Sequence, residues 1–265
     1  MHMQEMTIDE IKQQELVLMD EIHRVCEEHG LRYLLSYGSL LGAVRHEGFI
    51  PWDDDIDLFM PREDYEVFMR HFDEWKSDET IKVESPVVGD SPFEFAKVYD
   101  STSIIHQPHV RDRYSTGAWV DVFAYDACEE RPGVRGALLV LLTTLRYLST
   151  TNPKNKGINP AVTAIKRVFC PLFGLISPYA LSRAIDRVAK ARPPKDSGWV
   201  GLLCTYDPHG RYRYRREWME TTATYPFEGR RYVGPAAYDE ILTKDYGDWR
   251  EPHPTPMHTI DAYRL

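Results

Sequence analysis

The sequence is poor in cysteine and contains no closely spaced cysteine pair. Its four cysteines, Cys26, Cys128, Cys170 and Cys204, lie far apart along the chain. A zinc knuckle requires cysteines a few residues apart, and a disulfide scaffold requires a denser set, so both classes are disfavoured. We expect the cysteines to be reduced and buried in a cytoplasmic protein.

Long hydrophobic runs and a surplus of positive charge are missing as well. The best candidate for a membrane span, residues 136–145, has about ten residues, whereas about twenty are needed. The polar, acidic N-terminus disfavours a signal peptide. The formal net charge of −9 disfavours nucleic acid as a partner. With 265 residues, 43% of them hydrophobic, the chain fits one large domain or a domain with a sizeable insertion.

Carboxylates, by contrast, are concentrated in one place. Four aspartates, Asp53, Asp54, Asp55 and Asp57, fall within five residues. Like charges this close repel one another and raise each other's pKa values. A hard cation relieves that repulsion, most often Mg²⁺, with Mn²⁺ as the alternative. The cluster therefore predicts a metal-dependent transferase of phosphoryl groups.

The period of the predicted strand divides these aspartates into two pairs. Residues 55–60 alternate between apolar and other side chains, as a strand does. Asp55 and Asp57 then share one face, about 7 Å apart at Cα, and can hold a metal ion between them. Asp53 and Asp54 precede the strand. They either shape the turn through hydrogen bonds or act as further ligands, and the pattern leaves both open.

A glycine–serine pair lies upstream of this strand. Gly38 and Ser39 follow a predicted buried strand at 31–37 and precede a predicted short helix at 40–45. A helix that starts after a glycine turn presents unpaired N–H groups, which bind anions. The pair is a weak signal alone, but beside the carboxylates it predicts a phosphate site.

Two later strands each carry one charged residue among apolar neighbours. Lys97 lies in a predicted strand at 93–99, and it is either an edge lysine that reaches solvent or a phosphate contact. Asp121 is centred in a predicted strand at 119–123. It is either a buried carboxylate satisfied by loop hydrogen bonds or a third carboxylate beside the metal.

The remainder of the chain gives broader expectations. A capping box at Thr7 and Glu10 predicts a helix that ends at Gly30. Residues 136–190 read as apolar helices with local basic charge, which either pack on the sheet or contact a membrane surface. The basic and aromatic stretch 211–216 predicts an exposed strand face or help with an anionic substrate.

The stretch 38–57, which reads GSLLGAVRHEGFIPWDDDID, resembles the signature of the LicD family, which includes bacterial phosphocholine transferases and the fukutin-related proteins. Further similarity appears at Lys97, at 119–123, at 227–229 and at 246–248. The resemblance spans most of the chain, and the helical part is its least specific region.

The resemblance implies an α+β fold with a nucleotidyltransferase-like mixed sheet core, flanked by helices and extended by a helical subdomain. We predict a catalytic core at 1–130, a helical subdomain or insertion at 131–195, and a C-terminal segment at 196–265 that packs back on the core. The implied reaction moves a phospho-substituent, most often phosphocholine from CDP-choline, onto a hydroxyl of a cell-surface glycan or teichoic-acid precursor. The implied location is the cytoplasm or the inner face of the membrane, with a glycan or lipid-linked glycan as acceptor.

The resemblance also implies roles by position, with one or two Mg²⁺ ions as cofactor. The catalytic and metal-binding carboxylates would be Asp55, Asp57 and Asp121. The donor-binding residues would be Gly38, Ser39, Lys97 and Arg45. The roles of Asp53, Asp54, His46 and His258 stay open.

Two further functions remain as alternatives. A small-molecule nucleotidyltransferase, which transfers NMP from an NTP, would use the same Gly-Ser and Asp-x-Asp parts. A catalytically silent glycan- or nucleotide-binding protein is the third hypothesis. Choline would need an aromatic cage, because a quaternary ammonium group accepts no hydrogen bond and offers none. The residues of such a cage cannot be picked from the sequence, and ethanolamine, glycerol or ribitol phosphate stay open as head groups.

Overall fold

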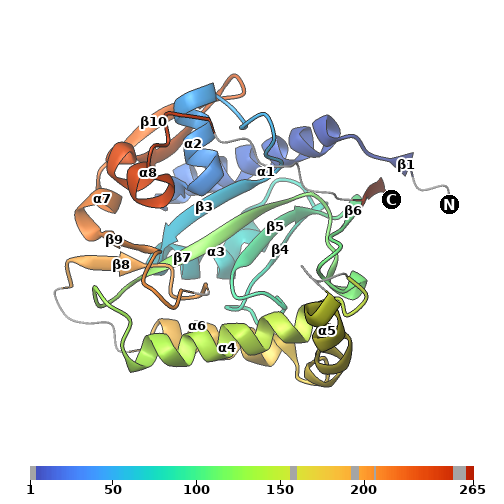
Figure 1. Cartoon of the computed structure of the whole chain (residues 1–265). Helices are drawn as coiled ribbons and strands as arrows, with labels where there is room; N and C mark the ends of the chain where they lie inside the picture. The colour runs from blue at the N-terminus through green and yellow to red at the C-terminus, as the bar shows by residue number, and fades with distance from the viewer. Residues whose placement is uncertain (1–3, 156–159, 192–196, 206, 253–260) are drawn as a thin grey trace.

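The computed structural model of the protein describes most of the chain, and Figure 1 shows the arrangement of its elements. The described residues are 4–155, 160–191, 197–205, 207–252 and 261–265. His258, together with most of the proline-rich tail, lies outside these ranges.

A mixed sheet forms the centre of the fold. Its strands run in the order β2 (Leu34–Leu35), β3 (Ile56–Pro61), β7 (Trp119–Ala127), β5 (Ala96–Asp100) and β4 (Ile81–Glu84). The strands β8 (Trp199–Gly201) and β9 (Arg213–Arg215) extend it from the end of β7. β3 and β7 are parallel and the other neighbours are antiparallel. The predicted α+β class with a mixed sheet and flanking helices is confirmed.

The first helix, α1 (Ile8–His29), begins and ends where the sequence predicts. The Thr7 hydroxyl accepts from the Glu10 amide, and the Glu10 carboxylate accepts from the Thr7 amide. Gly30 ends the helix at a φ of 65°, a left-handed conformation that glycine adopts without a Cβ penalty. α1 packs against β7 and β5. The predicted capping box is confirmed.

The next long helix, α3 (Arg62–Trp75), packs against β3, β7 and β4. Pro61 precedes its first turn, where a missing N–H costs little. Its predicted apolar stripe is buried in the core and consists of Tyr65, Phe68, Met69 and Phe72. The core therefore lies between the sheet and these helices.

The predicted helical region holds three helices. α4 (Val134–Thr150), α5 (Pro160–Phe173) and α6 (Pro178–Ala189) lie together along one side of the molecule, at the bottom of Figure 1. Leu139 and Ile185 from this region join the main hydrophobic cluster, as does Val200 beyond it. The three predicted segments thus share one core, and their boundaries stay a prediction.

Two smaller sheets complete the fold. β1 (Gln4–Glu5), β12 (Asp261–Arg264) and β6 (Ser103–His106) form one, so the two ends of the chain lie side by side (Figure 1). The hairpin of β10 (Thr222–Phe227) and β11 (Arg230–Pro235) forms the other. It is flanked by α7 (Arg216–Glu220) and α8 (Tyr238–Tyr246). β6 thus lies outside the main sheet, because it pairs with the C-terminal strand.

Three local predictions need correction. The strand expected at 31–37 is reduced to β2, because α2 (Tyr37–His46) already begins at Tyr37. The Ser36 carbonyl accepts from the Leu40 amide at 3.0 Å, so Gly38 and Ser39 form the first helical turn and do not precede it. The strand expected at 93–99 begins only at Ala96. The physical reason is a turn upstream, where the Ser91 hydroxyl accepts from the Phe93 amide at 3.0 Å.

The prediction for the basic and aromatic stretch 211–216 also needs correction. β9 is not an exposed strand face, because Arg213 and Tyr214 are buried. The Arg213 guanidinium donates to Asp207 at 2.6 Å, and the Tyr214 hydroxyl donates to the Asp245 carboxylate at 3.0 Å. Tertiary ion pairing thus draws these polar side chains inward.

The length and hydropathy of the helices bear on whether one of them could cross a membrane. Within the described residues, no single helix is long and apolar enough to cross a bilayer. The segments Lys166–Phe173 and Pro178–Ala189 reach that limit only as a pair, which is bent by 77°.

Candidate active site

A cleft of about 850 Å³ opens at the start of β3, and its volume is typical of a small-molecule site. α2 and the loop before β3 form one side, and the segments around Arg211 and the end of α8 form the other. Its described lining residues are Tyr37, Gly38, Leu41, Arg45, Ile50, Trp52, Asp53, Asp55, Asp57, Phe123, Thr205, Arg211, Tyr212, Asp245, Tyr246, Trp249 and Glu251. The cleft thus joins residues about two hundred positions apart in the chain.

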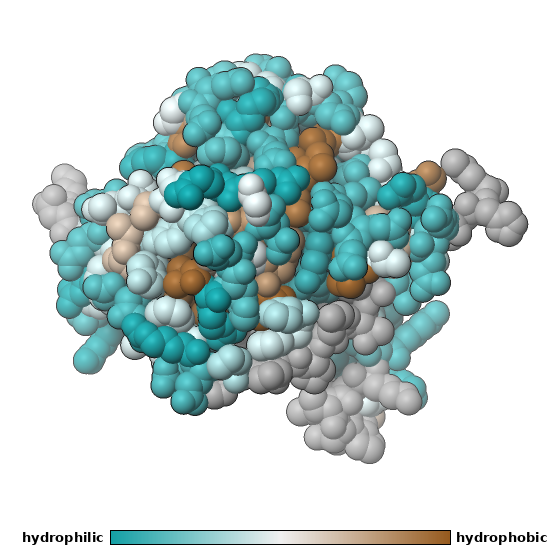
Figure 2. Space-filling model, turned by 90° about the horizontal axis from the view of Figure 1, so that it is seen from above, coloured by the Kyte–Doolittle hydropathy of each residue, from teal (hydrophilic) through white to brown (hydrophobic). Residues whose placement is uncertain are grey.

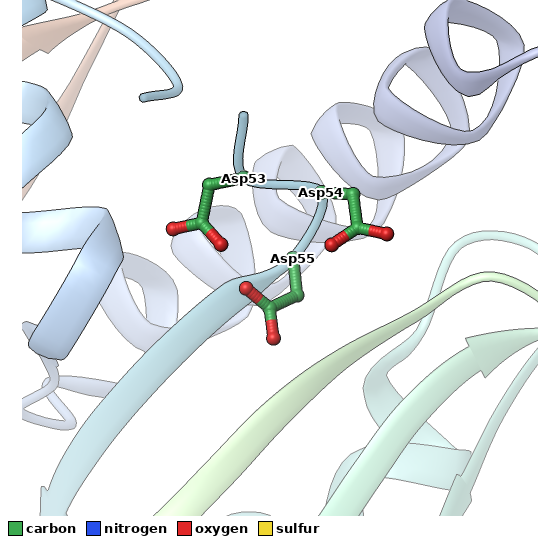
Figure 3. Close-up of side chains that lie close together, drawn as sticks. All are labelled: Asp53, Asp54 and Asp55. Atoms are coloured by element: carbon green, nitrogen blue, oxygen red, sulfur yellow. The ribbon is translucent and has the colours of Figure 1, made fainter. Parts of the chain in front are cut away.

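The aspartate cluster separates this cleft from a second cavity of about 330 Å³. Asp53 and Asp57 line the cleft, Asp54 and Asp121 line the smaller cavity, and Asp55 borders both. Figure 3 shows the Asp53 and Asp54 side chains on opposite sides of the loop, with Asp55 below and between them. The loop therefore turns its carboxylates toward two spaces at once.

Strand register explains why residues far apart in the chain meet here. In the parallel pair β3–β7, Asp57 lies beside Asp121. In the antiparallel pair β5–β7, Lys97 lies beside Asp121. Three neighbouring strands thus place one charged residue each in a single row. Asp55 lies two residues before Asp57, on the same face by strand alternation.

Burial and mutual repulsion shape the electrostatics of the site. Burial is the largest cause that raises the pKa of Asp55 well above its usual range, and the charges of Asp53 and Asp121 add to it. The pKa of Asp57 is likewise raised well above its usual range, by burial first and then by Asp55. Burial also raises the pKa of Asp121, although Lys97 counteracts this. Such a group is stable when a proton or a cation neutralises it.

The carboxylates that lie closest together differ from the predicted metal-binding trio. Oxygens of Asp53, Asp54 and Asp55 all lie within 4.8 Å of one another. Within the described part of the chain, Asp57 and Asp121 do not belong to a group that meets this distance. Hard carboxylate oxygens in a crowded, largely buried cluster are the donor set that Mg²⁺ prefers, so the residues present fit such an ion.

The glycine–serine pair has two separate roles in the geometry. Gly38 lines the cleft, and a Cβ atom there would lie only 2.3 Å from the Asp53 Oδ2 atom. Ser39 is buried, and its hydroxyl accepts from the Asp57 amide at 2.8 Å. Ser39 therefore joins α2 to β3, whereas Gly38 leaves room for the Asp53 carboxylate at the wall of the cleft. Their role in diphosphate binding stays a prediction.

Lys97 is not an edge lysine, because β5 lies between β7 and β4 and the residue is only 4% exposed. Its ammonium group donates to the Asp121 Oδ1 atom at 2.8 Å. It also lies 3.9 Å from the centre of the Trp119 ring. Lys97 is not among the described residues that line the large cleft. The structure thus places Lys97 as the partner of Asp121, and contact with the donor stays a prediction.

We expect Lys97→Met to lower the free energy of unfolding by about 3–5 kcal/mol, because it leaves the buried Asp121 carboxylate without its partner. Urea unfolding measures this change. Adding Asp121→Asn to Lys97→Met should restore much of the loss, and Lys82→Met on neighbouring β4 serves as the control. A loss smaller than about 1 kcal/mol would contradict the pairing.

Arg45 and Arg211 supply positive charge to the walls of the cleft. Arg45 donates to the Trp249 carbonyl at 2.9 Å and to the His46 Nε2 atom at 2.9 Å. Burial, followed by the charge of Arg45, lowers the pKa of His46, which keeps the imidazole neutral and able to accept. Arg211 donates to the Asp245 carbonyl at 3.0 Å. The guanidinium groups are therefore anchored beside the carboxylates.

Sequence reasoning missed most of the aromatic wall and two carboxylates. The aromatic residues are Tyr37, Trp52, Phe123, Tyr212, Tyr246 and Trp249. Burial raises the pKa of the cleft residue Asp245 to about 6. Glu15 on α1 lines the smaller cavity, and burial, followed by the charge of Asp55, raises its pKa well above its usual range. The available signal for Glu15 was a carboxylate on the apolar stripe of an amphipathic helix.

Comparison with known proteins agrees with this geometry. Residues 30–134 match the family described as LicD/FKTN/FKRP, nucleotidyltransferase domain. This range includes the aspartate cluster, Lys97 and Asp121. This part of the chain is similar to the LicD family.

The chain is similar to one relative over nearly its whole length and to others over a short stretch. The lipopolysaccharide cholinephosphotransferase LicD of Haemophilus influenzae is 27% identical over 96% of this chain and 98% of its own length. The human ribitol 5-phosphate transferase FKRP is 58% identical over 40 residues, which is 15% of this chain and 8% of that protein. An uncharacterized protein of Rickettsia prowazekii, RP689, is 45% identical over 47 residues, 18% of each chain.

Proposed function

We propose that the protein is a LicD-like phosphotransferase that moves phosphocholine from CDP-choline onto a hydroxyl of a cell-surface glycan or teichoic-acid precursor. The cleft carries this proposal, because three aspartates of the cluster share its walls with six aromatic residues. Carboxylates suit a metal-bound diphosphate, and aromatic faces suit a quaternary ammonium group. The relative that agrees over nearly the whole chain is a cholinephosphotransferase by name.

The residues divide the work of binding the donor. The first turn of α2, which lines the cleft at Gly38, offers amide groups to phosphate oxygens, as helix N-termini do. Arg45 and Arg211 add positive charge from opposite walls. The aromatic wall packs against the choline methyl groups or the cytosine ring. Each contact orients the donor, and orientation supplies much of the catalysis in phosphoryl transfer.

The carboxylates would hold one or two Mg²⁺ ions, with Mn²⁺ as a substitute, and Asp53, Asp55 and Asp57 are the ligands that face the cleft. When bound, the metal supplies charge neutralisation on the phosphate oxygens. In the reaction, an acceptor oxygen forms a bond to the phosphorus of phosphocholine and the bond from that phosphorus to CMP breaks. A carboxylate accepts the hydroxyl proton.

The test of the proposed function is product identity. The protein is incubated with Mg²⁺ and either CDP-choline or an NTP, together with a delipidated lipopolysaccharide acceptor. We expect CMP release from CDP-choline. Release of pyrophosphate from an NTP, without CMP release from any CDP-alcohol, would replace the proposal with a small-molecule nucleotidyltransferase. CDP-ethanolamine, CDP-glycerol and CDP-ribitol in parallel reactions identify the head group.

We also propose that the helical region contacts the inner face of the membrane, where a lipid-linked glycan would be available. Apolar side chains on α5 and the turn after it are 39–85% exposed, namely Val168, Phe169, Leu172, Leu175 and Ile176. Lys166 and Arg167 lie on the same helix, in a protein whose net charge is −9. Seen from above, the molecule carries its hydrophobic side chains in small separate groups on a mostly hydrophilic surface (Figure 2). Apolar side chains beside basic ones suit an anionic bilayer surface.

The Leu172→Glu/Leu175→Glu variant should bind vesicles that contain an anionic lipid about tenfold more weakly than the wild type. The change removes apolar side chains that would enter the bilayer surface, and it adds negative charge that the anionic lipid repels. Vesicle co-sedimentation measures the binding. Val17→Glu changes an exposed apolar residue on α1 and serves as the control. Equal binding by all three proteins would contradict the membrane contact.

A further inference from the structure

The cavity of about 330 Å³ on the far side of Asp55 carries a further inference. It lies between α1 and the chain after β6, and its volume falls within the range of small-ligand sites. Its described lining residues are Ile11, Glu15, Asp54, Asp55, Ile105, Gln107, Pro108, His109, Trp119 and Asp121. It does not overlap the large cleft except at Asp55.

Glu15 is the residue that makes this cavity unusual. Its side chain is 1% exposed, and its Oε2 atom has no hydrogen-bond partner among the described residues. A buried polar atom without a partner costs about 1–3 kcal/mol, so such atoms persist where a ligand or water completes them. α1 is otherwise an amphipathic helix whose buried stripe needs no carboxylate.

The chemistry of the walls limits what can complete this site. Glu15, Asp54 and Asp121 present carboxylates, which accept hydrogen bonds when ionised. Glu15 does not belong to the close carboxylate group of the loop, so direct ligation of the same metal ion is disfavoured. A neutral compound with several hydroxyl groups fits best. Each hydroxyl donates one hydrogen bond, and the carboxylates do not repel an uncharged compound.

We propose that this cavity is the acceptor subsite, where a sugar hydroxyl donates to the Glu15 Oε2 atom and the ring is held for attack. The inference rests on the proposed function for the identity of the reaction. Because Asp55 borders both spaces, a sugar held in this cavity would lie next to the carboxylates that face the donor cleft. Glu15 is a positioning residue for the acceptor.

The experiment compares Glu15→Gln with the wild type in steady-state transfer from CDP-choline to delipidated lipopolysaccharide. We expect the KM for the acceptor to rise about tenfold, as loss of a buried hydrogen bond predicts. The affinity for CDP-choline and Mg²⁺, measured by calorimetry, should change less than the KM for the acceptor. Glu27→Gln, an exposed carboxylate on the same helix, is the control.

A second variant and a binding measurement test the inference even if Glu15→Gln fails to fold or the proposed reaction does not occur. Gln107→Trp fills the cavity from the opposite wall and should reduce acceptor binding as well. Saturation-transfer NMR with methyl glycosides of hexoses and N-acetylhexosamines measures sugar binding without turnover. Wild-type protein that binds these sugars but uses no CDP-alcohol would retain the subsite and reject the proposed donor.

Each of three results would overturn the inference. If Glu15→Gln and Gln107→Trp leave the KM for the acceptor and the NMR signals at wild-type values, the cavity does not hold the acceptor. If Glu15→Gln changes only the thermal midpoint, Glu15 is a structural carboxyl. If donor affinity and acceptor KM change by the same factor, Glu15 belongs to the donor site.

Discussion

Asp57→Asn is expected to lower the transfer rate about a thousandfold while the protein stays folded. The change removes one carboxylate from the wall of the cleft, which we propose as a ligand for the catalytic cation. Metal stabilisation of a phosphoryl transition state amounts to several kcal/mol, and about 4 kcal/mol corresponds to a factor of a thousand. Release of CMP from CDP-choline measures the rate.

The same substitution should stabilise the metal-free protein. Asp57 is buried beside Asp55 and Asp121, and those carboxylates disfavour its charge. Asparagine keeps the shape of the side chain and the backbone amide that donates to the Ser39 hydroxyl, but it removes the charge repulsion. Thermal unfolding in EDTA should therefore show a higher midpoint for the variant. Asp73→Asn, an exposed aspartate on α3, is the matched control. Wild-type turnover by Asp57→Asn would refute its role as a ligand.

Removal of divalent metal is expected to abolish transfer and to make stability depend strongly on pH. The pKa values of Asp55, Asp57 and Asp121 are raised by burial in the folded protein. An unfolded aspartate titrates near pH 3.9. Between that pH and the raised pKa values, the folded state binds more protons than the unfolded state. Stability therefore falls as the pH rises through this window.

Added Mg²⁺ should counteract that fall, because it binds the ionised carboxylates of the folded state. Thermal midpoints between pH 5 and pH 8, with EDTA and with Mg²⁺, test this expectation. The increase on adding Mg²⁺ should be larger at pH 8, where protons compete less, and Mn²⁺ should also restore transfer. A midpoint in EDTA that rises with pH over this range, or full transfer in EDTA, would contradict a metal-dependent carboxylate cluster.

Features of the fold that depend on neighbours in the sequence could be predicted well. The capping box at Thr7, the end of α1 at Gly30 and the apolar stripe of α3 all follow from helical geometry. The alternation at the start of β3 placed Asp55 and Asp57 on one face. These signals act within a few residues and need no knowledge of the tertiary structure.

Most of the predictions that failed depend on partners remote in the chain. Of the two alternatives for Lys97, the edge lysine failed, because the sheet order places β5 between two other strands. Arg213 resembled an exposed base until Asp207 was found beside it. No local period encodes the choice of such a partner. In contrast, the strand expected at 93–99 begins only at Ala96, because Ser91 and Phe93 form a turn upstream.

The sequence by itself determined the chemistry of this protein: a crowded aspartate cluster, a glycine at the start of α2, and the family model that residues 30–134 match. Only the tertiary structure decided how that chemistry is distributed in space. It brought the aromatic residues around Tyr212 and Tyr246 to the aspartates, and it placed Glu15 in a separate cavity behind them. The reason is physical, since side-chain type and local period are written in the chain, whereas a cleft forms between segments that meet only when the sheet and its helices pack.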